Sequence, residues 1–190
     1  MSDPINNALL FLINTLFSLY LFILVIRLIL VWVRTDYFNP LTQFVVKLTD
    51  FLVKPLRRIL PNIKNLETAS FLWILVIETI KFYLVSILTF GAPNLTGLPI
   101  LAVGDFLSLL IQVFTFAIII QVILSFVQPM SPFTHVLYKI TSPIMRPIQK
   151  LIPPVGGFDI TPIPALIILQ LLAILLVSPI IEIGRSIAFG

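Results

Sequence analysis

Residues 8–33 read ALLFLINTLFSLYLFILVIRLILVWV, a run of 26 residues in which Arg27 is the only charged side chain. An α-helix needs about 20 mainly apolar residues to cross the hydrocarbon core of a bilayer. This stretch is therefore predicted to span a membrane. Three further apolar runs of comparable length follow, at about residues 70–90, 106–127 and 163–183.

The composition supports the same interpretation. Of 190 residues, 59% are hydrophobic and 11% are charged, whereas a soluble domain carries about 25% charged residues. A single globule of this size cannot hide so much apolar surface from water. The fold is therefore predicted to be that of an all-α membrane protein with four transmembrane helices, which excludes a soluble enzyme.

Two connections between the spans have a different pattern. In residues 40–61 and again in residues 132–153, apolar side chains recur at helical spacing while basic side chains occupy the opposite face. This pattern is typical of an amphipathic helix that lies along the membrane interface. Each segment is expected to break into short helices near its internal proline, with Pro55 beginning a second helix.

The two halves of the chain are related by a duplication with a constant offset of 92 residues. Each repeat consists of a span, an interfacial segment and a second span, which divides the chain into residues 1–98 and 99–190. The same comparison, after two loop residues are dropped, places Arg27 over Gln121. The six identical pairs are Pro40 with Pro132, Thr42 with Thr134, Lys47 with Lys139, Thr49 with Thr141, Pro55 with Pro147 and Pro61 with Pro153.

Loop charges predict the orientation in the membrane. The connection of residues 34–67 has six basic and three acidic residues, that of residues 129–162 has three and one, and residues 91–105 contain no basic residue. Basic residues concentrate in cytoplasmic loops. Both amphipathic connections are therefore expected in the cytoplasm, and both termini outside it.

Three charged residues lie within the first two predicted spans, namely Arg27, Glu78 and Lys81. An unpaired charge inside a bilayer is costly, so we expect the three to form one polar cluster between the first two spans, with Glu78 as the shared partner. Two simpler interpretations stay open: Arg27 could extend to the cytoplasmic headgroups, and Glu78 with Lys81 could form a local ion pair. An ion pathway is the remaining alternative.

A basic patch is expected at the cytoplasmic surface, where each cation contributes about 1 kcal/mol to attraction for anionic lipid. The partners that it predicts are the bilayer and its anionic lipids, with a membrane or cytoplasmic protein, or a second copy of this chain, as further occupants. Nucleic acid is not expected, because the cations lie on short loops between spans. The patch comprises Lys54, Arg57, Arg58, Arg146 and Lys150.

Several motifs together are similar to those of a known family. They occur at residues 27–32, 39–40, 49–50 and 55–61, and again at residues 131–132, 141–143, 146–153 and 156–162. The chain resembles the YggT family of bacterial and plastid membrane proteins over nearly its whole length. The second copy departs from the pattern at Gln121, Phe126 and Gln149, so that any function of these positions is expected in the first repeat.

The resemblance implies a bacterial inner-membrane protein linked with envelope and osmotic stress, and plastid relatives associated with cytochrome assembly. It implies no agreed molecular activity. The residues suggest no paired nucleophile and base, so no enzyme is expected. The sequence has no cysteine and a single histidine, so no cofactor or metal site is expected either. The leading hypothesis is a scaffold, assembly or stress factor, and the alternative is a small ion transporter or channel.

Overall fold

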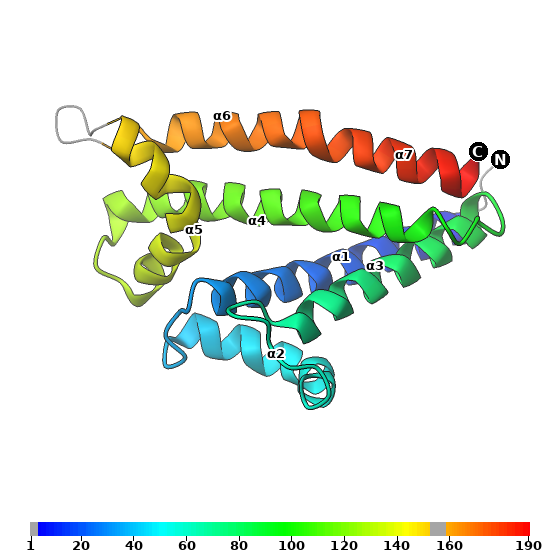
Figure 1. Ribbon diagram of the computed structural model, residues 1–190, viewed down its shortest axis with the longest axis horizontal. Helices are drawn as coiled ribbons and strands as arrows, with labels where there is room; N and C mark the ends of the chain where they lie inside the picture. Colours follow the sequence, from blue (N-terminus) through cyan, green and yellow to red (C-terminus); the bar gives the residue numbers. More distant parts are fainter. Residues whose placement is uncertain (1–3, 153–158) are drawn as a thin grey trace.

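The computed structural model describes residues 4–152 and 159–190, which form helices joined by short connections (Figure 1). A single β-bridge, between Ile63 and Leu66, lies in one of these connections. The helices are α1 (Pro4–Trp32), α2 (Pro40–Arg57), α3 (Thr68–Thr89), α4 (Leu98–Val127), α5 (Pro132–Leu151), α6 (Pro162–Leu172), the π-helical turn η1 (Ala173–Val177) and α7 (Ser178–Phe189).

Four helical stretches are long and apolar enough to cross a membrane: α1, α3, α4 and the continuous run from α6 through η1 to α7. The predicted all-α fold with four spans is thus confirmed. The largest difference is at α4, which begins at Leu98 and not near residue 106. Asp105 made this stretch look like a loop, but its charge pairs with Lys81 of α3 and is therefore tolerated inside the helix.

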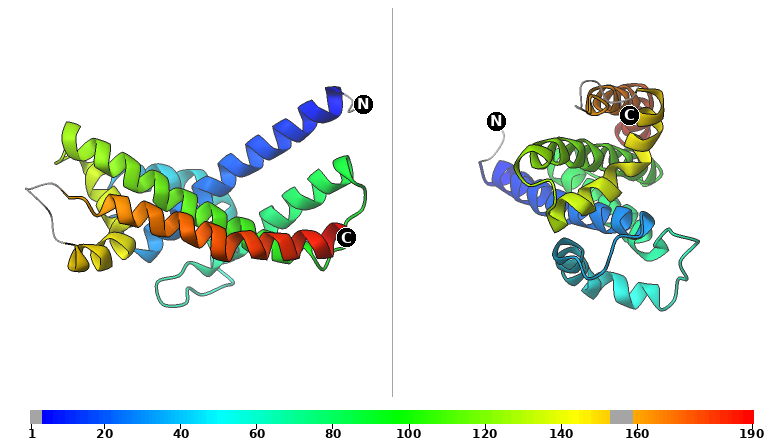
Figure 2. Two further views of the ribbon diagram at one scale, coloured as in Figure 1. Left: turned by 90° about the horizontal axis from the view of Figure 1, so that it is seen from above. Right: turned by 90° about the vertical axis from the view of Figure 1, so that its left-hand side faces the viewer.

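The spans run along the long axis of the molecule, and the two amphipathic helices lie together at one end of it (Figure 1). Both termini and the connection between α3 and α4 lie at the other end. Viewed end-on in the right-hand panel of Figure 2, α6 and α7 are strongly foreshortened, α1 is tilted, and α2 crosses the view. This arrangement agrees with placing both amphipathic connections on one side of a membrane.

Each repeat packs its second span against its first. Helix α3 contacts α1, and both α6 and α7 contact α4, while α4 also contacts α1 and α3 and so joins the repeats. The approach of α7 to α4 is close enough to require glycine. A Cβ atom at Gly184 would lie 2.9 Å from the backbone nitrogen of Leu101, and one at Gly104 would lie 2.7 Å from a side-chain carbon of Ile181.

Helix α2 has three distinct faces. It begins with Asn39 as N-cap, whose side chain accepts a hydrogen bond from the Leu41 N–H, and with Pro40 in the first turn, where a missing N–H costs nothing. One face is buried against the spans, a second is apolar and exposed, and a third is polar. The buried residues are Thr42, Val45, Thr49 and Val53, and the exposed apolar ones include Phe44, Leu48 and Phe51.

Helix α5 repeats this design. Ser131 is its N-cap and accepts a hydrogen bond from the Thr134 N–H, and Pro132 occupies the first turn. The Asn39 side chain donates a 2.9 Å hydrogen bond to the Pro132 carbonyl. The starts of the two amphipathic helices are therefore tied together across the repeats.

The expectation that internal prolines break these helices was wrong. Pro55 lies inside α2, and both Pro143 and Pro147 lie inside α5. A proline removes one backbone hydrogen bond, and at Pro55 this is the bond that an N–H would have donated to the Phe51 carbonyl, but α2 continues to Arg57. Pro61 follows α2, and its carbonyl accepts a hydrogen bond from Thr68; its counterpart, Pro153, lies outside the described residues.

The two ends of the bundle of spans are predicted to lie on opposite sides of the membrane. A reporter inserted at the exposed Asn62 should lie in the cytoplasm, whereas reporters at Asn94 and after Gly190 should lie outside. Six basic residues lie in the connection around Asn62, none lies in residues 91–105, and Arg185 alone lies near the C-terminus. Val155, which lies outside the described residues, should also report the cytoplasm. Alkaline phosphatase and green fluorescent protein fusions measure this, and an external signal at Asn62 would refute the orientation.

Candidate functional site

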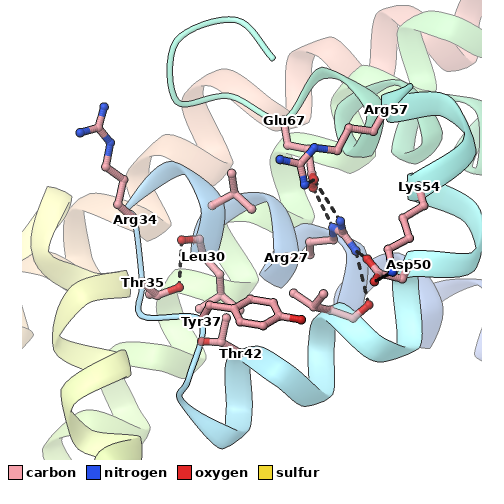
Figure 3. A pocket seen from close by; sticks show the side chains of 12 residues that line it. Arg27, Leu30, Arg34, Thr35, Tyr37, Thr42, Asp50, Lys54, Arg57 and Glu67 are labelled. Carbon is pink, nitrogen blue, oxygen red and sulfur yellow. Dashed lines mark hydrogen bonds and ion pairs between the residues drawn. The ribbon is translucent and has the colours of Figure 1, made fainter. Parts of the chain in front are cut away.

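Arg27 is the centre of a buried polar site near the C-terminal end of α1 (Figure 3). Its Nε donates to Oε2 of Glu67 at 2.7 Å, and its Nη2 donates to Oε1 of the same carboxylate at 3.0 Å. The side chain of Arg27 is 2% exposed and that of Glu67 is fully buried. This two-point contact fits the planar guanidinium and fixes the start of α3 against α1.

The remaining donors of Arg27 attach α2 to the same site. Its Nη1 lies 2.9 Å from the Thr49 hydroxyl oxygen and 2.8 Å from Oδ1 of Asp50. Thr49 in turn donates to the Val45 carbonyl within α2. One side chain thus connects α1, the underside of α2 and the N-cap residue of α3.

The two carboxylates of the site are held in their charged form. Burial by itself raises the pKa of Glu67, but the hydrogen bonds from Arg27 and Ser70, together with the Arg27 and Arg57 charges, lower that pKa below its usual value. Burial by itself also raises the pKa of Asp50. The hydrogen bonds from Lys54 and Arg27 outweigh this effect, so the pKa of Asp50 is lowered as well. The stability that these pairs contribute is therefore present at neutral pH and is lost only as the pH falls through the lowered values.

A cavity of about 380 Å³ opens beside this site, between α1, α2 and the connection that leads to α3 (Figure 3). Four basic and two acidic residues line it, which gives an excess of two positive charges. At the bottom of the cavity, the charge of Arg27 is balanced by its carboxylate partners. The excess positive charge therefore lies at the rim of the cavity. The charged lining residues are Arg27, Arg34, Lys54, Arg57, Asp50 and Glu67.

The predicted cluster of Arg27 with Glu78 and Lys81 was wrong. Arg27 pairs with Glu67 and Asp50, whereas Lys81 pairs with Glu78. Glu67 and Glu78 are separated by 11 residues of α3, about 16 Å along a helix. Because Arg27 lies near the end of α1, a carboxylate at the start of α3 is at its level, and Glu78 lies too deep.

Glu78 and Lys81 belong to a second cluster, together with Asp105 of α4. The Lys81 Nζ lies 2.6 Å from Oε2 of Glu78 and 2.5 Å from Oδ2 of Asp105. Lys81, not Glu78, is therefore the shared partner. The cluster joins α3 of the first repeat to α4 of the second, so it also holds the two repeats together.

Sequence reasoning missed three carboxylates of these clusters. In the sequence, Glu67 comes before the second span as helix-starting residues do, Asp50 lies on the polar face of an amphipathic pattern, and Asp105 ends the loop before the third span. One signal was available for Glu67, because the duplication pairs it with Asp159. An acidic residue at this position of both repeats indicates a role that the two copies share.

The second repeat contains an almost uncharged copy of the Arg27 site. Gln121 and Thr141, the counterparts of Arg27 and Thr49, are hydrogen-bonded to each other and buried. The side-chain amide of Gln149 donates to Asp159 at 3.0 Å, where the first repeat has Arg57 at 3.6 Å from Glu67. Amide and hydroxyl groups thus replace the charges in the contact of α4 with α5 and in the contact of α5 with the residues before α6.

The predicted basic patch lies on both amphipathic helices. Lys54 and Arg57 border the cavity and contact Asp50 and Glu67, with 69% and 54% of their side chains exposed. Arg58 follows at the end of α2, and Arg146 and Lys150 lie on α5; all three are exposed. Within the described residues, these last three make no salt bridge.

Comparison with known proteins identifies the family to which this chain belongs. A profile of the CCB3/YggT family matches residues 6–88 and 100–180, one match for each repeat. The chain belongs to the CCB3/YggT family. The two matches confirm the tandem duplication and the family resemblance that the proline and arginine motifs indicated.

Several members of the CCB3/YggT family align over most of their length. An uncharacterized protein of Pseudomonas aeruginosa is 38% identical over 178 residues, which cover 92% of this chain and 90% of that protein. The YggT protein of Escherichia coli, also called uncharacterized, is 33% identical over 87% of both chains. A Vibrio alginolyticus protein is 34% identical over 86% of this chain and 90% of its own. No solved structure matches.

The geometry of the second cluster predicts the order of two substitutions. Lys81→Met should lower the thermal stability of the purified protein strongly, by about 3 kcal/mol, because it leaves Glu78 and Asp105 without their common cation. Glu78→Gln should cost less, because the pair of Lys81 with Asp105 survives. Fluorescence-detected thermal unfolding measures both, with the exposed Glu182→Gln as control. Equal losses, or a larger loss for Glu78→Gln, would contradict this assignment.

Proposed function

We propose that this CCB3/YggT family member is a non-enzymatic scaffold of the bacterial inner membrane. Its working surface is the cytoplasmic face formed by α2 and α5, which binds anionic lipid and presents itself to a protein partner. The role in assembly of the envelope, or in its response to osmotic stress, follows from this surface and from the family resemblance. Both termini lie on the opposite side.

The observation that carries this proposal is the way α2 and α5 are held. Arg27 binds Thr49 beneath α2, and Gln121 binds Thr141 beneath α5. A hydrogen bond from Asn39 to the Pro132 carbonyl joins their starts. Two amphipathic helices fixed at three points form a defined surface, which is what a docking or lipid-binding face needs.

The side chains on this surface suit a membrane interface. On α2, Phe44 and Phe51 are 63% and 68% exposed, next to the polar face that carries Lys54. On α5, the aromatic Phe133 is 48% exposed. Apolar residues that enter the lipid beside cations at headgroup level are typical of interfacial helices.

Ion transport is the second candidate, and the charges in α3 and α4 favour it. Lys81, Glu78 and Asp105 lie inside spans, where ionisable residues often mark transport paths. In the described residues, however, the two clusters are separate sets of ion pairs at different depths of the bundle, so they do not line one continuous path. Ion flux into liposomes that contain the purified protein separates the candidates, since a scaffold should give no flux above protein-free liposomes.

Lipid binding tests the proposed surface. The substitutions Arg58→Gln, Arg146→Gln and Lys150→Gln remove three cations that make no salt bridge among the described residues. At about 1 kcal/mol for each cation, the combined variant should bind phosphatidylglycerol roughly 100-fold more weakly than the natural protein. Native mass spectrometry of the full chain, titrated with phosphatidylglycerol and with phosphatidylcholine, measures the difference.

The matched control is Arg185→Gln, which removes an exposed cation from α7 at the opposite end of the molecule. This variant should keep the preference for phosphatidylglycerol. Unchanged phosphatidylglycerol affinity in the triple variant, or an equal loss in Arg185→Gln, would count against a lipid-binding face on α2 and α5.

A further inference from the structure

The cluster of Glu78, Lys81 and Asp105 contains one negative charge too many. Two carboxylates face a single ammonium, at 2.6 Å and 2.5 Å. If all three groups were ionised, the cluster would carry a net charge of −1. Lys81 and Glu78 are 7% and 0% exposed, so water cannot screen this charge well.

The excess charge falls on Glu78. Asp105 receives a hydrogen bond from Lys81, is 28% exposed, and lies seven residues into α4, closer than Glu78 to the end of the spans where α3 joins α4. Glu78 is fully buried, and apart from Lys81 no group of the described residues donates a hydrogen bond to its carboxylate. Its Oε2 lies 2.6 Å from the Lys81 Nζ, and Lys81 is shared with Asp105. Burying a carboxylate that is so poorly matched is costly.

No second cation compensates for this. The titratable groups that act on Glu78 are Lys81 of its own helix and Asp105 of α4. Among the other helices that pack on α3, Arg27 of α1 and Asp50 of α2 are bound to each other near the far end of the spans. Glu78 lies ten residues into α3, about 15 Å, or half of a hydrocarbon core of about 30 Å.

We propose that Glu78 is a proton-binding site in the middle of the membrane, and that at neutral pH its carboxyl group carries an exchangeable proton. A protonated Glu78 makes the cluster neutral, because Lys81 then balances Asp105 alone. Removal of the proton restores the net charge of −1 and is therefore opposed by the surroundings. The proposal is independent of the scaffold role.

A proton fits this site better than a metal ion does. A metal ion needs several oxygen ligands around it, and within the described residues no group of three or more acidic or histidine side chains could supply them. The Lys81 ammonium, 2.6 Å from Oε2, would also repel a cation at that oxygen. A proton needs a single carboxylate oxygen. The partly exposed Asp105 gives the cluster its contact with the surface.

Infrared difference spectroscopy tests the proposal directly. The full chain, reconstituted in phosphatidylcholine liposomes, is titrated with acid and base while the C=O band of protonated carboxylic acids is recorded. An ordinary Glu side chain has a pKa of about 4.3 and is therefore ionised at neutral pH. We therefore expect a carboxylic acid band at neutral pH that is lost at higher pH and is absent in Glu78→Gln.

Two further variants keep the test decisive if Glu78→Gln folds poorly. Asp105→Asn retains Glu78 but leaves it as the only partner of Lys81, so the band should disappear at neutral pH. Glu67→Gln is the matched control, because Glu67 is equally buried but paired with Arg27, and this substitution should leave the band unchanged.

Three results would overturn the proposal. They are the absence of the band from the natural protein at neutral pH, its persistence in Glu78→Gln, and its persistence in Asp105→Asn. If the band is absent in sodium buffer but present when choline replaces sodium, the neutralising cation is sodium and not a proton.

Discussion

A guanidinium withdrawn from water at the end of a membrane span must be matched by acceptors, and at Arg27 these acceptors come from three different elements. Glu67 lies at the N-cap of α3, Thr49 and Asp50 lie on α2, and Arg27 itself is on α1. The amphipathic helix therefore cannot leave the spans without exposing a buried charge. Since removing one partner of a buried pair costs about 3–5 kcal/mol, this contact dictates the arrangement of the first repeat.

The second repeat shows which part of this arrangement depends on charge. Gln121 with Thr141 joins α4 to α5, and Gln149 with Asp159 joins α5 to the residues before α6, through amides and a hydroxyl. The contacts between elements can thus be kept without a guanidinium, since well-matched neutral groups avoid the desolvation of ions. The cavity beside Arg27 and the cations at its rim are therefore features that packing alone does not require, and they make the first repeat the stronger candidate for function.

Sequence reasoning predicted the spans, the duplication and the two amphipathic helices, because each of these leaves a periodic or repeated pattern. It did not predict the ion pairs correctly, because Arg27 and Glu67 are 40 residues apart and only the antiparallel packing of α1 on α3 brings them together. The predicted cluster did not take into account the depth of each charged residue in the membrane. Arg27 is near the end of its span and Glu67 just before the next, which places both at one level, whereas Glu78 lies in the middle. Asp105 was missed for a related reason, since a charge at the start of an apolar run looks like a boundary until its partner in α3 is known.

The central claim is that Arg27 and Glu67 act as one unit that fixes α1, α2 and the start of α3 to one another in the first repeat. A double-mutant cycle tests it most directly, with Arg27→Gln, Glu67→Gln and the double variant, each purified as the full chain and unfolded reversibly in mixed micelles. The account predicts that the two single losses in unfolding free energy are not additive, with a coupling energy of about 2–3 kcal/mol. A coupling energy below about 0.5 kcal/mol, the range of independent sites, would contradict it.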